Sequence, residues 1–299
     1  MHKYLRAIGF SRIRTPKQMH DLVMEVIQNA DKRSYTSNSE TTMLAEFCKD
    51  FANRIGMTVC GEFDEKDEFS YEYSFPYFRG DGISTEEDIS VERHAEKESY
   101  AGVCNDLRVG VSLIFYLQNM IDYAKIKYGE RLPVRGTSLT LSALSISGKV
   151  VLPIRKNKAD MEKIEKETTN RNKLIAQARQ GDEEAIETLT LEDMDTYNAV
   201  SKKIRTEDVL SLVDTYFMPY GVECDQYSIL GEILDCSTEK NKLTGEELWI
   251  LGVTCNDLIF DVCINKKDLY GEPAPGRRFK GTIWMQGIIN FPETYGVSG

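Results

Sequence analysis

Apolar residues near the N-terminus recur with a helical period. They lie at spacings of three and four residues and comprise Met19, Leu22, Val23, Val26 and Ile27. This spacing is typical of an amphipathic helix that buries one face. Thr15 supplies an N-cap, and Pro16 is the residue favoured at the first helical position. We therefore expect a helix from residue 16 to near residue 30, preceded by a short apolar strand at residues 4–10.

From about residue 42 onward the period changes to two, which indicates strands. Residues 57–61 and 69–75 alternate on either side of the acidic segment DEKDE, which we interpret as a hairpin turn. Further strands are predicted within residues 88–104 and 107–119. The pattern indicates a meander of antiparallel strands with few helices.

Three segments of this region are less regular. Residues 43–55 fit either a helix or an edge strand, and we favour the strand. Residues 120–129 predict a short helix that ends at a glycine. Residues 138–154 predict two strands, with a break near Ser147 and Gly148.

Charged residues dominate the next part of the chain. Residues 157–180 predict a long, mostly exposed helix, which Gly181 ends, and Asp182 can cap the helix that follows. A third helix is expected to begin at Thr206 and to end at Pro219–Tyr220–Gly221. Together these elements predict a helical insertion at residues 156–221.

The C-terminal part again predicts strands. Residues 227–265 contain three, the first two separated by a polar turn and the next two by Asn256–Asp257, a dipeptide favoured in type I′ hairpins. Residues 277–290 form a closing strand in which Gly281 and Gly287 indicate bulges or close backbone approach. Four or five such strands predict a small barrel that resembles an OB-fold.

The predicted fold class is therefore α+β. We expect three regions: a mostly antiparallel, β-rich region at residues 1–155, the helical insertion at 156–221, and a small β-barrel or OB-like sheet at 222–299. The pattern leaves open whether the two β-rich regions share one sheet.

Composition limits the function. The formal net charge is -11, which repels phosphate backbones, so nucleic-acid binding is not favoured. No apolar run is long enough to span a bilayer, and arginines interrupt the N-terminal segment where a signal peptide would be apolar. Seven cysteines without a CxxC pair indicate buried, reduced thiols. These features predict a cytoplasmic protein.

The sequence lacks the motifs of the common enzyme classes. It has no phosphate-binding glycine loop, no HExxH and no GxSxG nucleophile elbow. It has only three histidines, so we expect neither a metal site nor a cofactor, and no catalytic residue is assigned. Isolated acids beside the C-terminal strands, Glu223, Asp225 and Glu232, are the candidates for acid–base chemistry.

The closing strand, GRRFKGTIWMQGIIN, is the candidate binding surface. In an extended strand Arg278, Lys280 and Trp284 share one face, with Arg277 mostly on the other if a bulge at Gly281 resets the register. Cations next to an aromatic side chain on a small barrel can hold a ligand or a single-stranded nucleic acid. The alternative, which we favour, is that Trp284 packs in the core and the cations pair with acids.

Four stretches of the chain resemble a known family. They are MHKYLRAIGFS, DLRVGVSLIFYLQN, FMPYGVECDQYSILGEI and GRRFKGTIWMQGIINF. They resemble an uncharacterised family of bacterial proteins of about this length, catalogued as domain of unknown function 3881. The resemblance implies a cytoplasmic bacterial protein, and it supplies no activity, cofactor or catalytic residue.

Three functions remain open. The leading hypothesis is a non-catalytic protein that binds a protein partner or a small ligand, with Arg277, Arg278, Lys280, Trp284, Glu223 and Asp225 as candidate contacts. The alternatives are an enzyme of unrecognised family that uses carboxylates, and an OB-like nucleic-acid binder. No membrane partner is expected.

Overall fold

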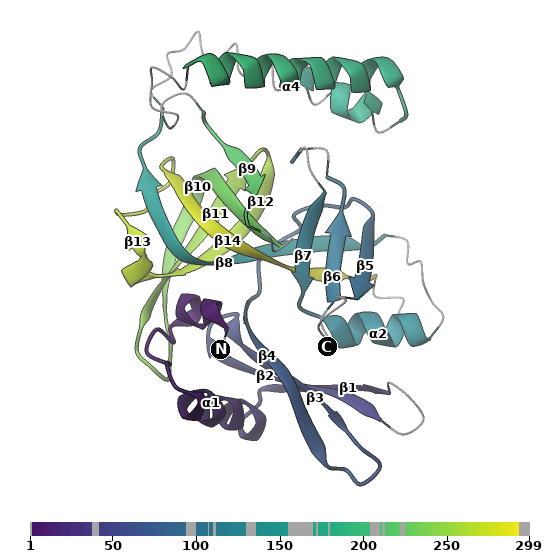
Figure 1. Cartoon of the computed structure of the whole chain (residues 1–299), viewed down its shortest axis with the longest axis vertical. Coiled ribbons are helices and arrows are strands. Elements are labelled where there is room, and N and C mark those ends of the chain that lie inside the picture. Colours follow the sequence, from purple (N-terminus) through teal and green to yellow (C-terminus); the bar gives the residue numbers. More distant parts are fainter. Residues whose placement is uncertain are drawn as a thin grey trace.

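The computed structural model describes most of the chain: residues 2–37, 42–93, 100–106, 108–109, 112–129, 136–154, 170–171, 173–178, 180–203, 210, 213–221 and 225–292. Figure 1 shows a β-barrel in the middle of the molecule, a second sheet on one side of it and a long helix on the other. The α+β prediction is confirmed.

Five strands close the barrel: β8 (Ser138–Val151), β10 (Gln226–Lys240), β11 (Glu247–Cys255), β12 (Leu258–Asn265) and β14 (Arg278–Asn290). β10, β11 and β12 form an antiparallel meander. β14 pairs with both β10 and β8, and β8 closes the ring by a parallel pairing with β12. Phe279, Ile283 and Met285 of β14 are among the residues that fill the barrel.

Shorter strands extend this sheet. β5 (Ile89–Arg93), β6 (Tyr100–Cys104) and β7 (Leu113–Leu117) form a meander, and β7 joins the barrel by a parallel pairing with β14. β9 (Tyr216–Pro219) pairs with β10, and β13 (Leu269–Tyr270), after the short helix η2 (Lys266–Asp268), pairs with β8. The two predicted β-rich regions therefore contribute to one sheet, while their division into separate regions stays a prediction.

The second sheet has the order β1 (Lys32–Ser37), β2 (Met43–Ala52), β3 (Ile55–Phe63), β4 (Phe69–Phe78). Helix α1 (Pro16–Gln28) contacts β2 and β3, and helix α2 (Met120–Tyr128) contacts β1 and β2. The α1 N-terminus is the predicted one, because Thr15 and Gln18 form a reciprocal capping box. The strand interpretation of residues 43–55 is also confirmed.

Helix α4 (Glu183–Lys203) belongs to the predicted insertion and lies beyond the barrel in Figure 1. Asp182 Oδ1 accepts hydrogen bonds from the amides of Glu184 and Ala185, as its predicted capping role requires. The first and third predicted helices of the insertion lie largely outside the described residues.

Three local predictions are wrong. Residues 4–10 form no strand, because η1 (Lys3–Ile8) is a 3-10 helix with buried side chains around much of its circumference, ended by Gly9 at φ 92°. Residues 138–151 form one strand without a break, since Gly148 admits the ring of Phe279 instead of making a turn. Residues 216–219, assigned to the third helix, pair with β10 as β9.

Candidate functional site

Arg278 is a structural cation in this fold. It is buried, and its guanidinium donates to the carbonyl oxygens of Leu152 (2.8 Å), Leu210 (2.7 Å) and Val213 (2.8 Å). Burial lowers its pKa, which nearby Asp214 opposes. These contacts join residues before and after α4 to the barrel, so the guanidinium is occupied within the chain.

Trp284 lies on the outside of the barrel but inside the protein. Its ring stacks on Tyr4 of η1, with centroids 5.3 Å apart, and lies 5.0 Å from the ring of Tyr116. Its indole Nε1 donates to Asp225 Oδ2 at 2.7 Å. Two predicted site residues, Trp284 and Asp225, are thus brought together, and the stacking of Trp284 on Tyr4 packs β14 against η1.

The other predicted residues do not converge. Arg277 donates to the carbonyl oxygen of Glu272, and Lys280 lies over the ring of Tyr216. Glu232 is exposed, and Glu223 lies outside the described residues. The side chains of β14 alternate as expected, with Arg278, Lys280 and Trp284 outside the barrel. Its pairing register with β8 shifts between Thr282 and Ile283, where β8 has the extra residue Ile146, and not at Gly281. Ligand binding through these residues stays a prediction.

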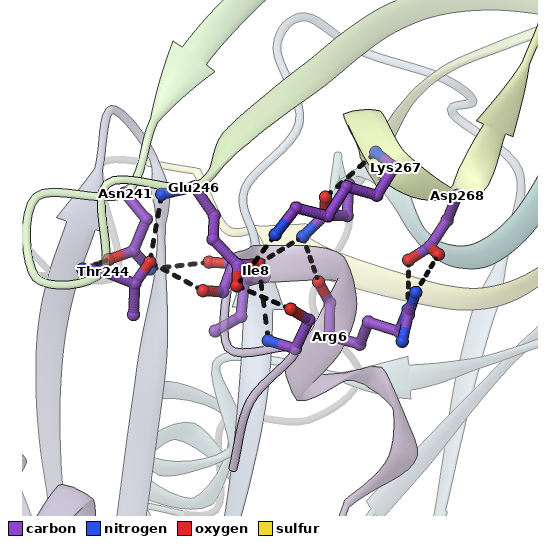
Figure 2. Close-up of polar contacts among 10 residues, drawn as sticks. Arg6, Ile8, Asn241, Thr244, Glu246, Lys267 and Asp268 are labelled. Carbon is purple, nitrogen blue, oxygen red and sulfur yellow. Dashed lines mark hydrogen bonds and ion pairs between the residues drawn. The ribbon is translucent and has the colours of Figure 1, made fainter.

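A buried carboxylate at Glu246 connects η1 to the barrel (Figure 2). Its oxygens accept from Ser11 Oγ (2.6 Å) and Asn265 Nδ2 (2.6 Å), and Lys267 Nζ lies 3.4 Å away. Burial alone would raise its pKa, but these hydrogen bonds and the lysine charge outweigh burial and lower the pKa below 4.5. Every hydrogen-bonding need of this carboxylate is met within the chain, which indicates an anchor.

The same cluster fixes the end of η1. Asn241 Nδ2 donates to the carbonyl oxygen of Ile8, Thr244 Oγ1 to that of Gly9, and Asn265 Nδ2 to that of Arg6. The side chain of Arg6 also pairs with Asp268 (Figure 2). The carbonyl groups that a helix end leaves unpaired are satisfied here by barrel residues.

A Glu246→Gln variant is expected to lose about 1–2 kcal/mol of unfolding free energy at neutral pH, because it weakens two charge-assisted hydrogen bonds and an ion pair. The loss should be present above pH 4.5 and shrink as the pH falls, since the wild-type carboxylate then becomes protonated as well. Urea unfolding at several pH values measures it. Glu247→Gln, at the exposed neighbouring acid, is the matched control and should have no measurable effect. Equal losses in the two variants would contradict the anchor assignment.

A second buried acid, Glu46 of β2, has the opposite environment. It is 5% exposed, and among the residues that the structure describes its Oε1 atom has no hydrogen-bond partner. Ser34 and Cys60 lie directly opposite Glu46 on the neighbouring strands, so the three side chains share one face of the sheet. This face carries Leu44, which packs against α2.

Glu46 lines a cavity of about 300 Å³ between this face of the sheet and the β7–α2 connection. We name it the Glu46 pocket. Lys32, Ser34, Cys48 and Thr58 line it from β1–β3, and Phe75, Tyr77 and Arg79 line it from β4 and the residue after it. Gln118, Asn119 and Asp122 lie on the opposite side, with Ile288 of β14. Its volume is at the lower end of the range for small-molecule sites.

Burial dominates the electrostatics of Glu46. Desolvation, with a smaller contribution from Asp122, raises its pKa from 4.5 to about 8, while Lys32 and Lys125 oppose the shift. At neutral pH the carboxyl is therefore mostly protonated. It can exchange a proton close to physiological pH, which is a common property of functional acids.

Gln118 contributes a second unpartnered oxygen. Its Nε2 donates to the carbonyl oxygen of Phe78 (2.8 Å) and to Gln286 Oε1 (3.0 Å), and Ser142 Oγ lies 3.3 Å away. Exchanging the amide nitrogen and oxygen would place the oxygen against these acceptors, so the orientation is fixed. Gln118 Oε1 is buried and, among the described residues, has no hydrogen-bond partner.

The thiols beside Glu46 are unreactive at neutral pH. Burial raises the pKa of Cys48 to about 11 and holds that of Cys60 well above its usual range. Within the described part of the chain no group of three His, Cys, Asp or Glu side chains is placed to hold a metal ion. The acid is therefore the group with useful chemistry in this pocket.

Sequence reasoning missed Glu46, because it assigned acids by their proximity to the C-terminal strands. One signal was present. In the strand interpretation of residues 43–55, Glu46 shares a face with Leu44 and Cys48, and an acid on an apolar strand face is rarely buried without a role. Whether such an acid is paired depends on α2 and β7, which the local pattern does not contain.

The fold and the site define an α+β protein built on a closed five-stranded barrel, with a pocket of mixed polar and apolar lining between its second sheet and α2. The chain belongs to the family described as "Domain of unknown function, E. rectale Gene description (DUF3881)", whose model matches residues 5–287. No curated protein and no solved structure matches the chain. Among the described residues, no helix combines the length and apolar character needed to cross a membrane.

Proposed function

We propose that the protein binds a small polar molecule in the Glu46 pocket. The observation that supports this proposal is a pair of buried, unpartnered oxygens, Glu46 Oε1 and Gln118 Oε1, on two residues that line one cavity. Leaving a buried polar group without a hydrogen bond costs about 1–3 kcal/mol. Glu246 shows that this fold can satisfy the hydrogen bonds of a buried carboxylate completely within the chain. The unpartnered oxygen of Glu46 is therefore suited to accept a hydrogen bond from a bound molecule.

Native mass spectrometry tests the proposal, on protein released gently from the cells that make it. The wild-type protein is expected to carry a small additional mass. A Ser34→Leu variant, which fills the pocket from β1, should lack this mass, whereas Ser237→Leu, the same change on an exposed part of β10, should keep it. A bare wild-type mass would contradict the proposal and indicate that water alone fills the cavity.

Acid–base catalysis is a second candidate, and the raised pKa of Glu46 favours it. A carboxyl that titrates near the operating pH can both donate and accept a proton. If the retained molecule is turned over, Glu46→Gln should reduce the rate by about 100-fold or more. Unchanged turnover in that variant would exclude Glu46 as the acid or base.

We further propose that the protein acts in a reducing compartment such as the cytoplasm. All six cysteines that the structure describes are free thiols, which fits such a compartment.

A further inference from the structure

We infer that the molecule bound in the Glu46 pocket presents a cationic N–H group, such as a primary ammonium, to Glu46 and Gln118. This inference rests on the proposed binding function and adds the chemical class of the ligand. Its basis is that the unpartnered atoms of the pocket-lining residues Glu46 and Gln118 are both oxygens, and that Gln118 Oε1 can only accept, so the ligand must supply a donor.

The fixed amide of Gln118 carries the first step. Because its nitrogen is occupied by Phe78 and Gln286, Gln118 can offer only an acceptor to the pocket. A ligand that brings only acceptors, such as a carboxylate or phosphate, would leave this oxygen unsatisfied. An ammonium has three donors and no acceptor, so it can satisfy Gln118 and Glu46 together.

The charges around the pocket support a cation over a neutral donor. Asp122 lies on the α2 side, and Glu46 becomes a second anion once its proton leaves. Of the two cations that line the pocket, Arg79 is engaged by Asp50 at 3.3 Å and stacks on Tyr77, 4.3 Å from the ring centroid. Lys32 on β1 is exposed and extends from the edge strand. Lys32 and Lys125 offset part of the negative charge at Glu46, and a ligand cation in contact with its carboxylate would offset it directly.

The aromatic side chains add a further attraction. Phe75 and Tyr77 line the pocket, and the face of an aromatic ring attracts a cation when water is excluded. These rings also offer apolar contact for a short hydrocarbon chain attached to the ammonium. The pocket volume accommodates a ligand of a few carbon atoms.

Binding of a cation must displace the proton of Glu46, which makes the affinity depend on pH. The groups that face Glu46 are Lys32 from β1, Asp122 and Lys125 from α2, Arg79 after β4, the thiols Cys48 and Cys60, and the phenols Tyr73 and Tyr116. Burial raises the pKa of both thiols and both phenols above their usual ranges, so these four stay neutral. Glu46 is therefore the group expected to titrate, with affinity for a cation increasing about ten-fold per pH unit below its pKa.

The experiment compares three probes of equal chain length: n-butylammonium, n-butanol and butyrate. Backbone NMR shifts of the pocket residues follow each titration on the full-length protein, between about pH 6 and about pH 7.5. We expect n-butylammonium to bind most tightly, with the ten-fold increase per pH unit. Glu46→Gln should lose this preference and its pH dependence, and Ser34→Leu should lose binding of all three probes.

The outcomes separate the inference from the proposed function. If n-butanol or butyrate binds in the pocket as tightly as n-butylammonium, the cationic ligand is ruled out while the binding function stands. If no probe shifts the pocket residues, the inference is overturned, and native mass spectrometry of the wild-type protein decides the binding function independently.

Discussion

A Glu46→Gln variant is expected to gain about 3–4 kcal/mol of unfolding free energy relative to wild type when the pH is raised from about 5 to about 8.5. The pKa of Glu46 is about 8 in the folded protein, against an ordinary value of 4.5. The folded state therefore binds the proton more tightly than the unfolded chain does. Stability from this group is fully present below pH 4.5 and is lost as the pH rises toward 8, because a buried charge must then form.

Glutamine has nearly the same shape as a protonated glutamate but cannot ionise, so the variant escapes this loss. Urea unfolding of both proteins across the pH range measures the difference. Glu65→Gln, in the exposed turn between β3 and β4, is the matched control and should follow wild type at every pH. Parallel stability curves for wild type and Glu46→Gln would show that Glu46 is not held in an apolar, protonated state.

Trp284→Ala is expected to lower the free energy of unfolding by about 3–5 kcal/mol. The indole is 4% exposed and contacts Tyr4, Tyr116 and Asp225, so its removal leaves a cavity between the barrel and η1 and removes the hydrogen bond to Asp225. Denaturant unfolding gives the value.

The other tryptophan of the chain, Trp249 on β11, provides the control. It is only partly buried, and Trp249→Ala should cost clearly less. A Trp284→Ala variant that keeps wild-type stability would contradict the packing role and restore Trp284 as a candidate contact for a partner.

Local patterns predicted the elements whose signals are contained in short stretches of sequence. The Thr15–Pro16 helix start, the β3–β4 hairpin and the tight turn at Asn256–Asp257 all depend on neighbouring residues, and all three are present. Asn256 and Asp257 have φ values of 50° and 62°, as a type I′ turn requires.

Long-range pairing was not predictable in the same way. The barrel is closed by β8, which precedes β10 by more than 70 residues in the chain, and no period within either strand encodes their place in one barrel. Gly148 illustrates the difficulty. In the sequence it looks like a break, but in the barrel it provides space for Phe279.

The candidate site was harder to predict than the fold. Arg278 and Glu46 are both charged residues in strands, yet one finds its partners within the chain and the other does not. That difference arises from residues far away in the sequence, namely Leu210 and Val213 for Arg278 and the β7–α2 connection for Glu46. Sequence reasoning could name candidate charges but could not tell which of them remain unpaired.

The most direct test of the account is an NMR titration of the glutamate side-chain carboxyl carbons, with Glu46→Gln used to assign the Glu46 signal. We expect one glutamate to titrate near pH 8 and its signal to be absent from the variant. Glu46 titrating near its ordinary value of 4.5 would contradict the account, because its carboxyl would then be solvated or paired and the pocket would lack its functional group.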